Sequence, residues 1–473
     1  MKNPLKERSK RFFILFAALF LVITPLAGVL ASSLSPEEER ELGERFLKSI
    51  NSQYEFADFP YITQYINDLG AYLGRQIEVP YFPLKFYVVK DNIVNAFAGP
   101  GGHVFIFSGL IISMEDMDEL ASVLAHELAH VSARHLASRI ERSQKISIAT
   151  IAGVLTGILV GGKASGALVT GSLAAGVQTE LGYSREDERQ ADQLGFKYAH
   201  LSGFNPSGML SVLKKMAREN WYQTGETPQY LLTHPGASER TASIEAMLEG
   251  YKKLPDSERA KELRSNFAMF HTMVIACCHD KDNAARVFEK KLLSDPESPL
   301  DHYGLGLVLE REGNIHEALN HFKKAFQKKP DSIPIMFSIG KAYQAEGQHE
   351  DSVSILKKAL ELAPQDKKIL YLMALSLQEL ERYDESSKIY ERLSFLPPVK
   401  DTVYYNLGLV YGRQGNIALA HYNLGIYFTK LNDREKALFH FNKAKELAET
   451  RPALKEKIEK ALTDLGRFQK QGQ

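Results

Sequence analysis

Two histidines and a glutamate within five residues have the spacing of a metal-dependent hydrolase. His126, Glu127 and His130 lie in residues 122–135, a stretch of Leu, Val and Ala without Gly or Pro that predicts a helix. Residues four apart share one helix face, so both imidazoles can reach the same metal ion. Glu127 can then contact a water on the metal without binding the metal itself. The pattern predicts two zinc ligands, a general base and an open coordination position.

The five-residue motif alone is weak evidence for a metal site, because a surface helix with a few polar residues can match it by chance. A third ligand is needed to support the interpretation. Residues 183–192 lead into a second expected helix and include three acids at Glu186, Asp187 and Glu188. Acids in a first helical turn also complement the helix dipole. Composition alone therefore leaves the choice among the three acids open.

Length and composition place the chain among ordinary globular proteins of two or more domains. The chain has 473 residues, of which 44% are hydrophobic and 25% charged. Its formal net charge of +0 does not point to nucleic acid. Cys277 and Cys278 are the only cysteines and are adjacent, which excludes a disulfide framework. We expect both to be buried in a helix.

The N-terminal segment has the organisation of a secretory signal peptide. Basic residues up to Arg11 precede an apolar run over 12–30, and small residues stand before Ser32. This predicts a signal peptide over 1–31 and a protein that works outside the cytoplasm. An uncleaved membrane anchor is the alternative, since the apolar run could just span a bilayer.

The part of the chain around the motif is expected to be an α+β unit. Its expected elements are helices over 35–50, 60–76 and 117–140, strands over 84–90 and 103–108, and a turn over 95–102. The second strand contains His103, Val104, Phe105 and Ile106. We expect it to be an edge strand whose backbone pairs with an extended substrate.

A long uncharged segment follows the predicted metal helix. Residues 146–162 and 164–177 are rich in Gly, Ala, Ser and Thr and are separated by Lys163. A membrane hairpin is one interpretation, but the runs are short and contain many glycines. We favour a mobile apolar hairpin over 146–177 that covers the active site or makes peripheral contact with a membrane surface.

Taken together, these motifs resemble a known family. His126-Glu-Leu-Ala-His130 followed by Glu188-x-x-x-Asp192 is similar to the gluzincin peptidases that include HtpX and the CAAX prenyl proteases. Within that family the chain looks most like the periplasmic type that carries tetratricopeptide repeats. The further matching pieces are Asn95-Ala-Phe-Ala, Pro100-Gly-Gly, Ser184-Arg185, Ala191-Asp192, Thr233-His234-Pro235 and Arg240.

The resemblance assigns roles to individual residues. It implies that Glu188 is the third zinc ligand and that Asp192 orients a zinc-bound histidine. It also implies that His234 can occupy the open coordination position and silence the enzyme. Arg240 would position the loop that carries His234 or the transition-state oxyanion.

The ligand set that the resemblance implies is chemically consistent with hydrolysis. Two neutral imidazoles and one carboxylate leave zinc with a net charge of +1, which lowers the pKa of a bound water to about 7. Glu127 can take the proton of that water and pass it to the leaving amine. We therefore expect one zinc per chain and a zinc endopeptidase.

The second half of the chain repeats with the period of tetratricopeptide units. Gly306, Gly340, Ala374 and Gly408 are each 34 residues apart. The same step separates the prolines that end each second helix, which are Pro296, Pro330, Pro364 and Pro398. Gly425 falls half a period after Gly408, so one helix over 417–430 is expected to serve two successive units. We expect roughly five repeats and a capping helix.

These inferences define the expected architecture. The fold class is mainly α, with an α+β gluzincin-type metalloprotease domain and a small β-sheet followed by an α-solenoid of tetratricopeptide repeats. The expected boundaries are 1–31 for the signal peptide, 32–264 for the peptidase domain and 265–473 for the repeat domain.

Two functions remain open at this point. The first is a periplasmic zinc endopeptidase that hydrolyses misfolded or unassembled polypeptides in outer-membrane protein quality control. The resemblance implies that its repeat domain docks on the outer-membrane barrel-assembly machinery. The alternative is a chaperone or assembly adaptor for outer-membrane β-barrel proteins, with a mostly latent protease site.

Overall fold

The computed structural model describes residues 34–57, 59–142, 183–223 and 228–467. The expected signal peptide over 1–31 and the expected hairpin over 146–177 lie outside these residues. In the described ranges, no helix is both long enough and apolar enough to cross a membrane.

The chain divides into two compact units, each described here by itself. The first unit combines Met1–Phe56 with Ile66–Arg264, and the second combines Ala57–Tyr65 with Ser265–Gln473. The division in the second half of the chain thus falls between Arg264 and Ser265. The short segment Ala57–Tyr65 groups with the repeats, although its sequence neighbours belong to the first unit.

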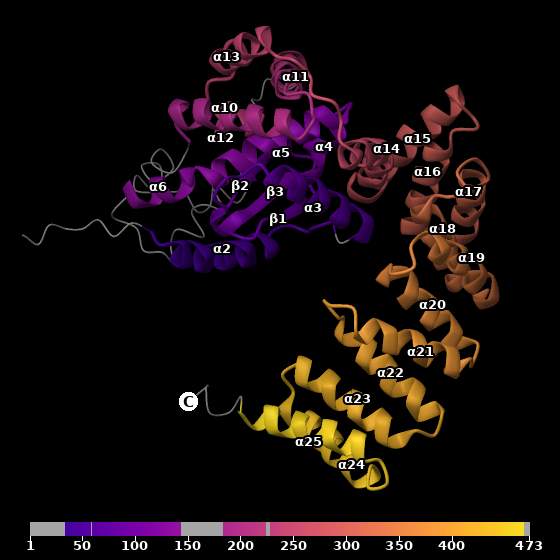
Figure 1. Ribbon diagram of the computed structural model, residues 1–473. Coiled ribbons are helices and arrows are strands. Elements are labelled where there is room, and N and C mark those ends of the chain that lie inside the picture. The colour runs from indigo at the N-terminus through magenta and orange to yellow at the C-terminus, as the bar shows by residue number, and fades with distance from the viewer. Residues whose placement is uncertain (1–33, 58, 143–182, 224–227, 468–473) are drawn as a thin grey trace, which may run out of the picture. The chain divides into compact units, whose positions relative to one another are not determined.

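Helices surround a three-stranded sheet in the first unit (Figure 1). Its strands are β1 (Lys85–Val89), β2 (Ala96–Ala98) and β3 (His103–Phe107). The described helices that begin before residue 143 are α2 (Pro36–Asn51), α3 (Pro60–Gly74), η1 (Pro100–Gly102), α4 (Ser108–Ser113), α5 (Met117–Ser132) and α6 (His135–Arg142). Those that follow are α10 (Arg185–Leu201), α11 (Ser207–Gln223), α12 (Gln229–Thr233), α13 (Ala237–Glu249) and the first part of α14 (Glu258–Cys278).

The sheet separates an aromatic core from the helix that carries the histidine motif. Alternate residues of a strand point to opposite faces, so Phe97, Phe105 and Phe107 share one face of the sheet. That face packs on Phe46 of α2, whose ring meets Phe97 and Phe105 edge-on. The opposite face lies against α5, which is therefore buried on nearly all sides.

The expectation that residues 103–108 form an edge strand is wrong. The strand order is β1-β3-β2, and β3 pairs in parallel with β1 and antiparallel with β2. The backbone of His103, Val104, Phe105 and Ile106 is thus engaged on both sides, and every side chain of β3 is buried. The strands at the two edges are β1 and β2, and β2 lies within the segment expected to be a turn.

The helix expected over 117–140 is interrupted. α5 ends at Ser132, and α6 begins at His135 after Arg134, which has a φ of 52°. A left-handed residue other than glycine needs support from its surroundings. The Arg134 guanidinium supplies it by donating to a carboxylate oxygen of Glu39 and to the carbonyl of Leu34. This contact with α2 overrides the local helical propensity.

The second unit is a series of antiparallel helix pairs (Figure 1). After the last part of α14 and α15 (Lys281–Ser294) come α16 (Pro299–Glu312), α17 (Ile315–Lys328), α18 (Ile333–Ala345), α19 (His349–Leu362), α20 (Lys367–Glu379), α21 (Tyr383–Ser394), α22 (Asp401–Arg413), α23 (Ile417–Lys430), α24 (Arg434–Leu447) and α25 (Pro452–Arg467). The mainly helical fold class is confirmed. Cys277 and Cys278 are both buried in α14, as expected.

Small residues set the spacing within the helix pairs. A Cβ on Gly408 of α22 would lie 2.9 Å from Leu424, and one on Gly425 of α23 would lie 2.6 Å from Phe441. The helix α23 therefore packs closely on two neighbours. It contacts α22 at Gly408, and it contacts α24 at its own Gly425. This dual contact explains the half-period step in the sequence.

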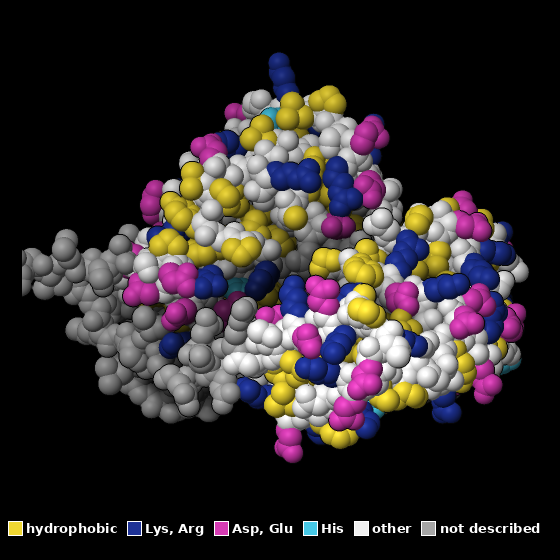
Figure 2. Space-filling model, turned by 60° about the horizontal axis from the view of Figure 1, so that its bottom comes forward, with side chains coloured by type: hydrophobic (Ala, Val, Ile, Leu, Met, Phe, Trp, Pro, Cys, Tyr) yellow, Lys and Arg dark blue, Asp and Glu magenta, His cyan; other side chains and the backbone are white. Residues whose placement is uncertain are grey.

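Acidic and basic side chains are interspersed on the face of the molecule shown in Figure 2. This distribution agrees with the formal net charge of +0. The face shown does not carry the single-sign field that nucleic-acid binding requires.

Two histidine pairs join neighbouring helices of the second unit. The Nδ1 atoms of His302 and His321 lie 2.9 Å apart, and those of His421 and His440 are separated by the same distance. Burial lowers the pKa of His321, His421 and His440, and the neighbouring histidine lowers the pKa further for His321 and His440. The folded repeats therefore prefer these rings neutral.

We expect the repeat unit to lose stability as the pH falls below the unfolded histidine pKa of about 6.5. Below that pH the unfolded chain binds more protons than the folded one, so protonation favours unfolding. Hydrogen exchange of peptides from α17 and α24, corrected for intrinsic rates, should show less protection at pH 5.5 than at pH 7.5. The control is the double variant His321→Gln, His440→Gln. An equal loss of protection in that variant would exclude the histidine pairs as the cause.

Candidate metal centre

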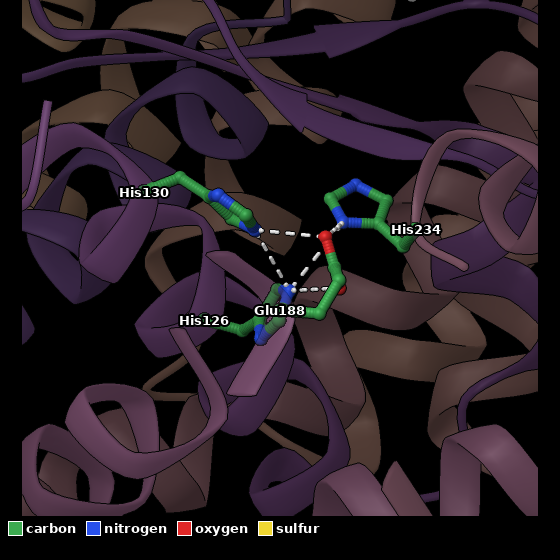
Figure 3. Close-up of side chains that lie close together, drawn as sticks. All are labelled: His126, His130, Glu188 and His234. Atoms are coloured by element: carbon green, nitrogen blue, oxygen red, sulfur yellow. Dashed lines mark hydrogen bonds and ion pairs between the residues drawn. The ribbon is translucent and has the colours of Figure 1, made fainter. Parts of the chain in front are cut away.

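Four side chains converge at the centre of the first unit. His126, His130, Glu188 and His234 are buried, and one ligand atom from each lies within 4.8 Å of all the others (Figure 3). The Nε2 atoms of His126 and His130 are 3.1 Å apart. Each of these atoms is 3.4 Å from an oxygen of the Glu188 carboxylate. The structure thus brings together the three ligands proposed from the resemblance, with His234 beside them.

The helix α10 brings the carboxylate to the histidines. It begins with a capping box in which Ser184 and Asp187 satisfy each other's backbone N–H groups. Glu188, Asp192 and Gly195 then follow at helical spacing on the face that packs on α5. A Cβ on Gly195 would lie 3.0 Å from the backbone N and Cα of His126. Glycine at this position therefore permits the close approach of the two helices.

A buried ionic network orients His126. The Nδ1 atom of His126 is 3.0 Å from Oδ1 of Asp192. Arg240, from α13, donates to both oxygens of Asp192 at 2.8 Å and lies 2.9 Å from Oε2 of Glu188. A carboxylate on Nδ1 leaves the Nε2 lone pair of His126 directed into the cluster. Asp192 therefore contacts a histidine of the motif, and Arg240 contacts Asp192 and Glu188.

His234 comes from the loop after α12 and reaches into the same cluster. Its Nδ1 atom is 3.0 Å from Oε1 of Glu188, and its Nε2 atom is 3.4 Å from the carbonyl oxygen of Ala96 in β2. The rings of Tyr230 and Tyr183 flank it, with centroids at 4.4 and 5.3 Å. The imidazole is thus held between the ligand carboxylate and the edge strand.

Glu127 lies beside the cluster without a hydrogen-bond partner among the described residues. Both of its carboxylate oxygens are buried, and Oε1 is 3.6 Å from Nε2 of His234. Burial raises its pKa above the usual value, although the charges of His234 and His126 oppose the shift. A carboxylate with a raised pKa is suited to accept and return a proton near neutral pH.

The charges of the cluster are strongly coupled. Burial by itself would lower the pKa of His126, but hydrogen bonds to Asp192 and Glu188 raise it to about 9. Burial lowers the pKa of His130 well below its usual value. Burial would raise the pKa of Glu188, but the charges of His234 and Arg240 hold it well below its usual value. The carboxylate is therefore ionised, as a metal ligand must be.

The donor set fits a bound divalent metal. Two imidazole nitrogens face each other at 3.1 Å, and one of them must carry a proton unless a cation lies between them and Glu188. Oε2 of Glu188 forms an ion pair with Arg240, whereas both oxygens of Glu127 are buried without a hydrogen-bond partner among the described residues. Such groups are costly to bury unless an ion and its water satisfy them. The cluster is compatible with a metal ion held by His126, His130 and Glu188.

Sequence reasoning did not assign to the site two side chains that contact the cluster, His135 and Tyr183, nor Gln190, which contacts His135. His135 lies 2.9 Å from Nδ1 of His130, and Gln190 lies 2.9 Å from the other nitrogen of His135. Tyr183 stacks on His130 at 3.9 Å and donates from its hydroxyl to the carbonyl of Ala98. The position of His135 five residues after His130 could have indicated a role at the site. In a continuous helix, however, its side chain would point away from His130, and the interruption at Arg134 was not predicted.

A buried His-Glu cluster on two packed helices beside a small sheet defines a metallopeptidase domain. Residues 59–248 match the family model described as peptidase family M48. This part of the chain is therefore similar to that family, and the resemblance drawn from the sequence is confirmed. Residues 309–440 match a model of a tetratricopeptide region, that of the Psidin N-terminus.

Named proteins with the same type of domain are similar to this chain. The beta-barrel assembly-enhancing protease of Yersinia pestis is 36% identical over 207 residues, which cover 43% of this chain and 42% of that protein. The protein of the same name from Escherichia coli strain K12 is 34% identical over 214 residues, with coverages of 45% and 44%. The mitochondrial metalloendopeptidase OMA1 of Schizosaccharomyces pombe is 28% identical over 265 residues, with coverages of 52% and 74%. The matched part of the chain thus spans less than half of the two bacterial relatives.

We expect Gly195→Ala to weaken metal binding by about tenfold. The added methyl group would press on the α5 backbone at His126 and shift Glu188 and Asp192 by a few tenths of an ångström. Alanine favours a helix by about 1 kcal/mol over glycine, so the thermal stability of the metal-free protein should change little. Competition with a zinc chelator measures the affinity.

The matched control is Gly250→Ala at the end of α13. Its Cβ would meet nothing within 4 Å, and the φ of −98° suits alanine. Equal zinc affinities for the two variants would contradict the packing argument.

Proposed function

We propose that this chain is a zinc-dependent endopeptidase of the periplasm that hydrolyses misfolded or unassembled polypeptides. The observation that carries the proposal is the buried set of two imidazoles and one carboxylate beside the Glu127 carboxylate, whose oxygens have no hydrogen-bond partner among the described residues. Two histidines and a glutamate are a ligand set of catalytic zinc sites. The proposed stoichiometry is one zinc per chain.

The proposed chemistry is hydrolysis of a peptide bond. When bound, zinc supplies a Lewis acid that acidifies water and polarises the scissile carbonyl. Glu127 accepts the proton of the attacking water and returns it to the leaving amine. Asp192 and Arg240 hold His126 and Glu188 in place, because their charge-assisted hydrogen bonds are buried and short.

The edge strand β2 is the proposed binding site for extended substrate. Phe97 pairs with β3, so the backbone groups of Ala96 and Ala98 point to the other side of β2. The outward carbonyls of these two alanines accept from His234 and Tyr183, respectively. A substrate strand that pairs with β2 would compete with both side chains. Only polypeptides with free backbone groups can do this, which supports unfolded chains as substrates.

The proposed cellular role is quality control of outer-membrane β-barrel proteins. The names of the bacterial relatives refer to enhancement of barrel assembly, and the repeat unit offers helical surface for a protein partner. We propose that the repeats recruit substrates or dock on the barrel-assembly machinery.

A second candidate function is that of a chaperone or assembly adaptor whose protease site is mostly latent. The observation that favours it is the position of His234, which lies 3.0 Å from Glu188 and 3.4 Å from His126. An imidazole in this position can fill the coordination place that a substrate or water needs. The two functions can coexist in one protein.

We expect Glu127→Gln to reduce cleavage of a denatured polypeptide by about 10²–10⁴-fold while zinc content stays unchanged. The amide cannot accept the proton of water, but it keeps the shape of the side chain. The rate is measured by gel electrophoresis and zinc by elemental analysis. Glu249→Gln, the same change at an exposed position of α13, is the control.

The same variant separates the two candidate functions in cells. Under the protease hypothesis it fails to restore outer-membrane integrity when it replaces the wild-type gene. Full restoration would assign the main role to the chaperone function.

We expect His234→Ala to raise the rate of proteolysis several-fold. The change removes the side chain that approaches Glu188 and also frees the carbonyl of Ala96 for substrate. The assay uses the same denatured polypeptide, with His316→Ala, an exposed histidine of the repeat unit, as the control. A rate below that of wild type would instead give His234 a direct catalytic role.

A further inference from the structure

The two histidines of the motif have different partners behind them. Nδ1 of His126 faces the Asp192 carboxylate at 3.0 Å. Nδ1 of His130 faces another imidazole, since Nδ1 of His135 lies 2.9 Å away. Nε2 of His135 in turn lies 2.9 Å from the side-chain oxygen of Gln190. His130 is therefore oriented by His135 and Gln190, which neither the resemblance nor the proposed mechanism uses.

The series of hydrogen bonds from His130 through His135 to Gln190 can run in only one direction if His130 is to bind a metal. Nε2 of His130 points at Glu188, so Nδ1 must carry the proton and donate to Nδ1 of His135. His135 then carries its own proton on Nε2 and donates it to Gln190. The Gln190 oxygen is only an acceptor, so it selects this tautomer of His135.

The opposite tautomer would be incompatible with the metal site. If His135 carried its proton on Nδ1, it would donate to Nδ1 of His130. His130 would then hold its proton on Nε2, where it blocks the lone pair that a metal needs. Since His135 is buried, with 4% of its surface exposed, water does not readily replace its hydrogen bond to His130.

The fold brings His135 and Gln190 next to His130. His135 would point away from His130 in a continuous helix, because residues five apart do not share a face. The left-handed residue Arg134 ends α5 and turns His135 back. Gln190 lies two residues after Glu188 on α10, so one helix delivers both a ligand and the end of the hydrogen-bond chain.

We propose that His135 and Gln190 are positioning residues that hold His130 in its metal-binding tautomer. The proposal rests on the proposed metal site and extends it to residues that do not touch the metal. It predicts that zinc affinity depends on a hydrogen-bond acceptor at the position of His135 Nδ1 more than on the volume of the ring.

The test compares His135→Leu with His135→Asn in the full chain. Leucine fills space but accepts no hydrogen bond, whereas Oδ1 of asparagine can take the place of Nδ1. We expect His135→Leu to lower zinc affinity by about 10–100-fold and His135→Asn to stay within a few-fold of wild type. Chelator competition on the metal-free proteins gives the affinities without any activity measurement. The visible spectrum of the Co²⁺-loaded proteins should change for His135→Leu and be retained for His135→Asn.

A second comparison uses α10. Gln190→Leu removes the acceptor for His135, and Gln193→Leu makes the same change three residues on. Both glutamines are exposed, so the two variants differ in the bond to His135. We expect only the first variant to weaken zinc binding. Circular dichroism of the metal-free proteins checks that each variant is folded.

The outcomes separate this inference from the proposed function. A folded His135→Leu protein with wild-type zinc affinity would overturn the positioning role, while the metal site would stand. Equal loss in His135→Leu and His135→Asn would also overturn it, because packing would then be the cause. A wild-type protein that binds no zinc would overturn both the inference and the proposed function.

Discussion

The close contact of α10 with α5 is the constraint on which the site depends. The contact is possible because Gly195 presents only hydrogen to the backbone at His126, where a methyl group would lie 3.0 Å away. It carries Glu188 and Asp192 into a buried space already occupied by two imidazoles. Burying two carboxylates is costly, and Arg240 offsets the cost by bonding or pairing with both. The geometry of the ligands is thus set by backbone packing and stabilised by one buried cation.

The same packing connects the metal centre with the edge of the sheet. The face of the sheet opposite the aromatic core lies on α5, and its free edge at β2 ends beside the cluster. His234 and Tyr183 each contact a ligand residue and also bond to an outward carbonyl of β2. Any chain that pairs with β2 must compete with these bonds. Under the proposal that substrate pairs with β2, substrate binding would displace His234 and Tyr183 from these carbonyls.

Local patterns in the sequence were sufficient for much of the fold and part of the site. The His-Glu-x-x-His motif works at the level of one helix, since its two imidazoles share a face wherever that helix lies. The tetratricopeptide period is also local, because each repeat packs mainly on its neighbours. The choice of Glu188 among three acids needed the resemblance. In the structure that choice follows from the helical face shared with Asp192 and Gly195.

Long-range contacts decided what the local patterns did not. Residues 103–107 look equally like an edge or a central strand, and only the pairing of β2 and β1 on either side makes β3 central. Residues 117–140 have no helix breaker, yet the bonds from Arg134 to Glu39 and Leu34 interrupt the helix and turn His135 toward His130. The sequence by itself determined the helical face of the motif, the repeats and the types of ligand. The tertiary structure decided the order of the strands and the partners of His126 and His130, because these depend on contacts between residues far apart in the chain.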